Sequence, residues 1–391
     1  MKGWILEMSN DFCFSGNWEQ IKERYEQWWK GENKDGPIMH VLAPNANASN
    51  ATRVADRWVA SSGGGDEAVP TESPHEANLS VAEHKLNWTD SNRILDRNIA
   101  MFRDSHYCGD TFPRMYANLG PASLAAFLGA PLIFRADTVW YQELDQELED
   151  TELTMDPDQE WLQWSINTVK KLKKWESGRY IAAMPELCEQ LDVLAQLFGP
   201  QKFLMSMYEC PDDVHRLLRQ VQDAWLAAYD MHYEAQARED GFCCYGPFAL
   251  LGKGKVAKIQ CDTSAMFSPA MFEEFALPYL DELTQKLDKT MYHLDGVEAV
   301  RHLDYVLSLE KLDALEWTPG ATYPDGGDES WDFIYDKALD AGKRIYALVS
   351  PKHIERFVKR YGGAGVYIMT QATSPEMADS LVALSRQLCR R

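Results

Sequence analysis

Residues 290–320 decide the fold and read TMYHLDGVEAVRHLDYVLSLEKLDALEWTPG. The stretch opens with a predicted short buried strand, Thr290–His293, which is soon followed by Asp295. Val297–Leu309 carries apolar residues at helical spacing, and Leu312–Trp317 predicts a second short strand. In βα proteins, ligands bind at the carboxyl ends of the strands. Two successive strand ends that carry a histidine, carboxylates and a tryptophan therefore indicate a binding or catalytic site.

The same alternation of short apolar strands and helices extends over most of the chain. The other predicted strands are Ile38–Leu42, Arg114–Leu119, Pro131–Val139, Tyr180–Met184, Val256–Cys261, Arg344–Val349 and Val366–Thr370. Strands that alternate with helices at this spacing are typical of parallel sheets. Roughly eight such units predict an α/β fold, a single (β/α)8 TIM barrel. No GxGxxG follows a predicted strand, so a doubly wound dinucleotide-binding domain is the less favoured alternative.

The domain boundaries follow from the N-terminal region. Residues 1–37 are predicted to form a helical extension, and residues 38–391 the barrel. Within the extension, residues 17–30 (NWEQIKERYEQWWK) place aromatic residues at helical spacing, which is typical of a core or docking face. Residues 44–78 are rich in Asn, Ser, Gly and Pro, and we interpret most of them as a long surface loop or lid.

Composition excludes several classes of function. The formal net charge is −21, which argues against nucleic acid or an anionic membrane as a partner because phosphate binding needs basic patches. No apolar run approaches the roughly 20 residues that span a bilayer. The N-terminus does not resemble a signal peptide. None of the eight cysteines forms a CxxC pair, which argues against a structural zinc ribbon. We expect a soluble cytoplasmic protein with a small-molecule substrate; a homodimer is left open.

Four stretches resemble the uroporphyrinogen decarboxylase superfamily, which also holds the cobalamin-dependent methyltransferases. ANLGPASLAAFLGAPLIFRADTVW (117–140) resembles a barrel segment in which a strand ends in a catalytic aspartate, here Asp137. MYECPDDVHRLLRQVQDAW (207–225) and FSPAMFEEFALPYLDEL (267–283) resemble helical segments of the family. YHLDG and LEWTPGA resemble two consecutive strand ends. The resemblance covers most of the chain from about residue 110 onward and implies an enzyme.

Two departures from the family pattern bear on the reaction. The arginine motif by which the decarboxylases hold porphyrin carboxylates has no match in the N-terminal region. The methyltransferases bind zinc through a His-x-Cys pair and a distant cysteine, whereas this chain has His293-Leu294-Asp295 and no cysteine in Tyr367–Thr373. Zinc accepts histidine and carboxylate ligands. The loss of both thiolates nevertheless makes thiol-activating zinc chemistry less favoured.

The candidate catalytic residues are Asp137, His293, Asp295 and Glu316. A histidine at a strand end can be a metal ligand, a general acid or base, or a structural residue. His293 is also the candidate ligand for zinc. Asp295 is either its orienting partner or a turn residue before a glycine. Asp137 is either a carboxylate that stabilises a protonated intermediate, as the resemblance implies, or the partner of Arg135.

The candidate substrate-binding residues are Trp140, Tyr141, Gln260, Asp262, Trp317 and Gln371. The aromatic ones can wall a pocket or serve packing alone. The favoured hypothesis is an enzyme that acts on a small polar metabolite by decarboxylation or related lyase chemistry. One alternative is a zinc-dependent methyltransferase with a corrinoid protein as partner. The other is a non-catalytic metabolite-binding barrel.

Overall fold

The computed structural model describes residues 12–45, 48, 79–136 and 138–390. Asp137 and most of the predicted surface loop lie outside the described residues. Seven strands form the central sheet, in the order β2-β1-β13-β12-β11-β10-β9. Their bounds are β1 Ile38–Pro44, β2 Ser105–Gly109, β9 Val256–Gln260, β10 Lys289–Asp295, β11 Ala314–Thr318, β12 Arg344–Leu348 and β13 Val366–Gln371. All neighbours are parallel except β1 and β2, which are antiparallel.

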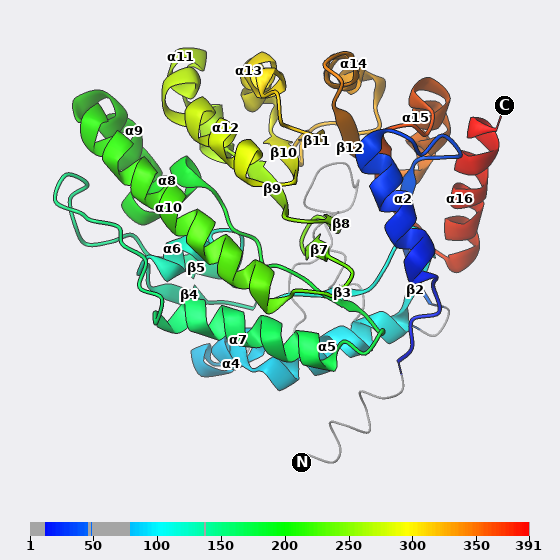
Figure 1. The fold of residues 1–391 in the computed structure, drawn as a ribbon, viewed down its shortest axis with the longest axis horizontal. Helices are drawn as coiled ribbons and strands as arrows, with labels where there is room; N and C mark the ends of the chain where they lie inside the picture. Colours follow the sequence, from blue (N-terminus) through cyan, green and yellow to red (C-terminus); the bar gives the residue numbers. More distant parts are fainter. Residues whose placement is uncertain (1–11, 46–47, 49–78, 137, 391) are drawn as a thin grey trace.

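The helices alternate with these strands and lie around them (Figure 1). Helices α11 to α16 occupy the connections after β9, β10, β11, β12 and β13, as expected for βα units. The helices are α2 Trp18–Lys30, α4 Val81–Thr89, α5 Ser91–Asp104, α6 Ser123–Phe127, α7 Glu160–Trp175, α8 Gln190–Phe198, α9 Pro200–Glu209, α10 Pro211–Ala235, α11 Pro269–Met271, α12 Leu277–Lys286, α13 Leu303–Ser308, α14 Asp332–Asp340, α15 Ile354–Tyr361 and α16 Pro375–Cys389. Within the described part of the chain, no helix combines the length and the hydrophobicity needed to cross a bilayer.

The predicted closed barrel is not found among the described strands. Three strand pairs lie outside the main sheet: β3 Arg114–Met115 with β6 Ile181–Ala182, β4 Leu132–Phe134 with β5 Val139–Tyr141, and β7 Phe242–Tyr245 with β8 Leu250–Lys253. The single strand predicted over Pro131–Val139 is wrong, because Arg135 donates its backbone N–H to the carbonyl of Thr138 at 3.0 Å and closes a hairpin. The fold is therefore a mixed α/β arrangement around a mainly parallel, open sheet.

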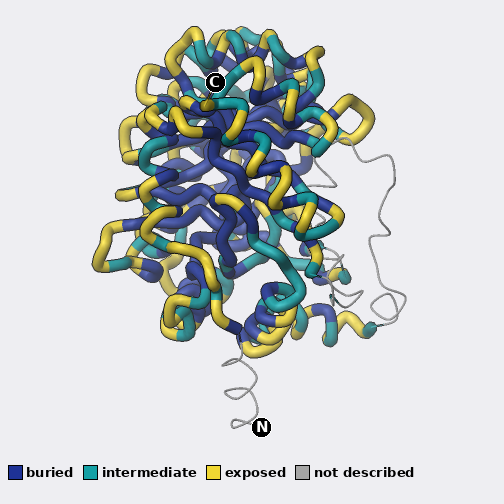
Figure 2. The backbone as a smooth tube through the Cα atoms, turned by 90° about the vertical axis from the view of Figure 1, so that its right-hand side faces the viewer, coloured by how far each residue is buried: buried dark blue, intermediate teal, exposed yellow. Residues whose placement is uncertain are grey.

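Burial concentrates in the strands of this sheet. Every residue of β9 and β11 is buried, and most residues of β10, β12 and β13 are buried as well. Figure 2 shows buried segments through the centre of the molecule and exposed segments around them. Parallel strands covered on both faces are expected to be apolar throughout. The polar side chains inside β9, β10 and β11 are exceptions that need partners, and several of them contact one another.

Helix α2 lies at the amino-terminal ends of β12 and β13. Asn17 caps its start by accepting from the backbone N–H of Gln20, and Gly31 ends it at a φ of 72°. Arg344, the first residue of β12, donates to the carbonyl of Trp29 at 3.1 Å. Tyr25 and Tyr367 share a hydrogen bond of 3.0 Å. Since α2 contacts the N-terminal parts of these strands, their carboxyl ends point away from α2. The division into an extension and a barrel stays a prediction.

Candidate metal-binding site at the strand ends

Three neighbouring strands bring the polar side chains together. In the parallel register, Gln260 of β9 lies opposite His293 of β10, and His293 lies opposite Glu316 of β11. Asp295 lies opposite Thr318 one layer closer to the carboxyl ends. Because side chains two residues apart share a face of a strand, both layers point to the same side of the sheet.

Glu316 holds His293 in one orientation. Nδ1 of His293 hydrogen-bonds Oε2 of Glu316, and the other carboxylate oxygen accepts from the hydroxyl of Thr318 at 2.8 Å. Glu316 is fully buried and His293 is 8% exposed. A carboxylate can only accept, so Nδ1 carries the hydrogen and Nε2 is left for another ligand. This is the arrangement that orients metal-binding histidines in proteins.

Asp262, His293 and Asp295 each offer one donor atom, and the three atoms lie within 4.8 Å of one another. Asp262 lies two residues beyond the end of β9, and Gly296 turns the chain immediately after Asp295 with a φ of 81°. His293 is buried, Asp295 is half-buried and Asp262 is exposed, so the donors reach solvent from the strand ends. We call these three residues, with Glu316, the strand-end site.

The charges at the strand-end site shift two pKa values. Burial alone would lower the pKa of His293, but Glu316, Asp262 and Asp295 outweigh it and raise the pKa to about 9. Asp262 is exposed at its surface, but desolvation by the surrounding protein and the neighbouring Asp192 raise its pKa to about 7, although His293 acts in the opposite direction. The site therefore concentrates negative charge that favours a cation.

A buried lysine, two residues before Gln260 in β9, supports the site. Nζ of Lys258 forms an ion pair of 2.9 Å with Glu186 and donates to the side-chain oxygen of Gln260. The amide nitrogen of Gln260 then donates to Asp262 at 2.7 Å and to Asp192 at 3.1 Å. The predicted substrate residue Gln260 thus links Lys258 to the carboxylates. Sequence reasoning missed Lys258; its signal was a charged residue two positions before Gln260 inside a buried strand.

Two carboxylates at the start of α8 face the end of β9. Asp192 accepts from the backbone N–H of Asp262 at 3.0 Å and from the hydroxyl of Thr263 at 2.6 Å. Glu189 accepts from the backbone N–H of Gln260 at 3.1 Å. Burial raises the pKa of Glu189 well above its usual range. The sequence places both residues just after a predicted strand end, but they were not singled out as site residues.

Three predicted aromatic residues are not members of this group of donors. Trp317 is on the opposite face of β11 from Glu316 and packs on Trp331 with ring centroids 5.2 Å apart. Trp140 is 60% exposed in the β4–β5 hairpin. The hydroxyl of Tyr141 donates to the carbonyl of Leu119, and burial, with smaller effects of Cys188 and Glu186, raises its pKa well above the usual range.

Gln371 ends β13, two strands away from β11 in the sheet. Asp137 lies outside the described residues, so its predicted role stays a prediction. Cavities of about 380 and 230 Å³ are lined by residues other than those of the strand-end site. The substrate-binding roles predicted for the aromatic residues therefore stay predictions as well.

The donor chemistry of the strand-end site fits a divalent cation. Two carboxylates balance the charge of a dication, and an imidazole with an anchored Nδ1 adds a nitrogen ligand. Zinc accepts this mixture of nitrogen and oxygen ligands. The three residues include no thiolate, so the set is harder than a cysteine-containing one and also suits other divalent metals.

Of three comparisons with known proteins, the one with solved structures found a protein of similar fold. No protein-family model matches the sequence, and a search of curated proteins found no match. Among solved structures, the chain is similar to a methyltransferase from Methanosarcina mazei with a TM-score of 0.54 and 14% sequence identity. The similarity covers 95% of this chain and 99% of the other. At this identity, the likeness shows that the two chains share a fold over nearly their whole lengths.

Proposed function

We propose that this protein is a metal-dependent methyltransferase that moves a methyl group from a corrinoid protein to a small thiol. The observation that carries the proposal is the convergence of Asp262, His293 and Asp295 within 4.8 Å at the carboxyl ends of adjacent parallel strands. The full-length structural likeness to a methyltransferase supports it. We also propose that the open sheet, with β3 and β6 beside it, is a divergent form of the (β/α)8 barrel.

Asp262, His293 and Asp295 would hold the ion, and zinc is the candidate. Although the missing thiolates make thiol activation less favoured than in a cysteine-containing site, a divalent ion bound there would still act as a Lewis acid that lowers the pKa of a coordinated thiol. Glu316 keeps the His293 ring in place through Nδ1, and Thr318 fixes Glu316 in turn. Glu316 and Thr318 are both buried, so these contacts hold the His293 ring in one orientation.

The second layer of contacts positions Asp262. Gln260 donates to Asp262 at 2.7 Å, and Lys258 holds Gln260 from the buried side. Asp192 binds the backbone N–H groups of Asp262 and Thr263 at 3.0 and 2.8 Å. These contacts fix both the main chain and the side chain that follow β9. Such outer contacts typically change metal affinity 10- to 100-fold.

The decarboxylase hypothesis has less support than the methyltransferase. The comparison structure is a methyltransferase, and Asp262, His293 and Asp295 gather as potential metal ligands at the strand ends. A metabolite-binding role without catalysis does not call for an anchored histidine beside two carboxylates. We therefore rank methyl transfer first.

The proposal is tested by methyl transfer in vitro. Methylcobalamin serves as the methyl donor, 2-mercaptoethanol as the acceptor, and loss of the methyl–cobalt absorbance as the readout. We expect zinc-loaded wild-type protein to accelerate the reaction, His293→Ala to abolish the acceleration, and the partly exposed His215→Asn to retain it. Equal rates for wild-type protein and His293→Ala would overturn the proposal.

A further inference from the structure

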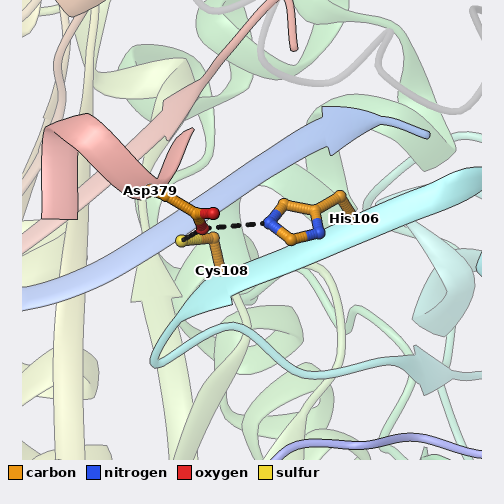
Figure 3. Close-up of side chains that lie close together, drawn as sticks. All are labelled: His106, Cys108 and Asp379. Atoms are coloured by element: carbon orange, nitrogen blue, oxygen red, sulfur yellow. Dashed lines mark hydrogen bonds and ion pairs between the residues drawn. The ribbon is translucent and has the colours of Figure 1, made fainter. Parts of the chain in front are cut away.

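A second group of metal-ligand side chains lies outside the strand-end site. His106 and Cys108 are on β2, the edge strand of the sheet, and Asp379 is on α16, which packs against β1 and β2. Figure 3 shows the three side chains pointing toward one another. We call these three residues the edge cluster. Their donor atoms all lie within 4.8 Å of one another.

Strand geometry explains why the two β2 residues converge. His106 and Cys108 are two positions apart, so both side chains leave the same face of the strand, the face toward α16. His106 Nε2 lies 3.1 Å from Oδ1 of Asp379, and Cys108 Sγ lies 3.0 Å from the same oxygen (Figure 3). One carboxylate oxygen therefore meets both an imidazole nitrogen and a thiol.

These separations are close to those of a zinc site. Zinc lies about 2.0–2.3 Å from nitrogen, oxygen and sulfur ligands, which places tetrahedral ligands roughly 3.3–3.7 Å apart. The observed 3.0 and 3.1 Å need to open by only a few tenths of an ångström. The side chain of Asp379 is 65% exposed and can make that adjustment.

The surroundings leave room for a fourth ligand. A cavity of about 380 Å³ borders the cluster and is lined by Cys108 and Asp379 together with Asp110, Gln20 and Arg386. A space of this size holds several water molecules. Three protein ligands and one solvent ligand make a zinc site with an open position.

We propose that His106, Cys108 and Asp379 bind a zinc ion between β2 and α16, with water as the fourth ligand. The thiolate and imidazole select zinc or a similar transition metal over magnesium or calcium. Neither β2 nor α16 contributes to the strand-end site, so this site is separate from the one proposed for methyl transfer.

Cobalt spectroscopy separates the two sites. A thiolate bound to Co²⁺ gives an intense near-ultraviolet charge-transfer band, and the strand-end site holds no thiolate. We expect Co²⁺ added to the full-length protein to give this band in the wild type and in His293→Ala. The band should vanish in Cys108→Ser. In Asp379→Asn, the apparent affinity for Co²⁺, measured from the band, should fall at least tenfold. Cys13→Ser, which alters an exposed cysteine, should retain it.

Zinc binding gives a second readout. In the His293→Ala background, one zinc per chain should remain, and zinc should raise the melting temperature because it binds only the folded state. Adding Cys108→Ser to that background should remove both effects. A missing band in the wild type, or a band that survives Cys108→Ser, would overturn the edge-cluster proposal. Neither result bears on methyl transfer, because that activity is assigned to a different site.

Discussion

Glu316 binds Nδ1 of His293 from the adjacent position of the neighbouring strand, and both side chains are buried. This contact occupies Nδ1, so Nε2 is the ring nitrogen that would be left to bind a metal. It also supplies the attraction that raises the pKa of His293 against the effect of burial. The pair is therefore the structural centre of the proposed metal site.

Replacing His293 should remove the metal from the strand-end site. The ring is the only nitrogen donor of the group formed by Asp262, His293 and Asp295, and two carboxylates alone hold zinc weakly. Metal analysis of Cys108→Ser protein should find one zinc per chain, and adding His293→Ala should leave none. The partly exposed His215→Asn in the same background should retain the ion. Undiminished zinc after loss of His293 would contradict the assignment.

Replacing Glu316 with glutamine should weaken metal binding without removing it. The amide keeps the size of the side chain but loses the charge that orients the His293 ring, and such partners are worth 10- to 100-fold in affinity. Competition with a chromophoric chelator measures the change. Glu298→Gln, an exposed neighbour outside the hydrogen-bonded pair, is the control. Equal affinities for Glu316→Gln and the control would show that Glu316 does not position His293.

Breaking the ion pair between Lys258 and Glu186 should destabilise the fold. Lys258 is fully buried, so Lys258→Met leaves Glu186 without its counter-charge, at a cost of about 3–5 kcal/mol. The double variant Lys258→Met with Glu186→Leu should recover much of the loss. Lys359→Met breaks an exposed pair with Glu355 and should change the free energy of unfolding by less than about 1 kcal/mol. Urea titrations measure all three, and additive losses in the double variant would contradict this account.

His232 should make the protein less stable in mild acid. Its Nδ1 donates to the carbonyl of Ala228 at 2.7 Å, and Nε2 accepts from Ser165 at 2.8 Å, so the ring is neutral. Burial lowers its pKa from 6.5 to about 4, although the Ala228 carbonyl acts in the opposite direction. Between these values the unfolded chain binds a proton that the folded chain does not, so stability falls as pH falls from 6.5 to 4. The loss is at most about 3 kcal/mol.

The variant His232→Gln isolates this effect. Its free energy of unfolding should lack the component that the wild type loses between pH 6.5 and 4, while both should share the contributions of all other groups. Chemical denaturation at a series of pH values gives the comparison. Parallel curves for the two proteins would show that His232 does not stay neutral in the folded state.

The sequence was informative where neighbouring strands are close in the chain. His293, Asp295 and Glu316 belong to successive strands, so their proximity follows from a single βα unit. Lys258 could not be placed in the same way, because its partner Glu186 is 72 positions earlier and belongs to a different unit. Trp317 could have been excluded, because it alternates with Glu316 along β11 and so faces the helices.

The closed barrel was predicted because the apolar segments are nearly evenly spaced. Hydrophobic spacing does not distinguish one strand from two short ones joined by a turn, and the polar residues Arg135 and Thr138 mark such a turn. The antiparallel strand β2 was missed for a different reason. Its sequence, SHYCG, has half-buried residues and no apolar run, because it is an edge strand that pairs on one side only.

Anomalous X-ray diffraction from crystals of the zinc-loaded protein tests the central claim most directly. We predict a zinc peak within about 2.0–2.2 Å of a carboxylate oxygen of Asp262, Nε2 of His293 and a carboxylate oxygen of Asp295. Nδ1 of His293 should remain on Glu316. The absence of a zinc peak among these three residues, in crystals that show zinc elsewhere, would contradict the proposed metal site and the methyl transfer that rests on it.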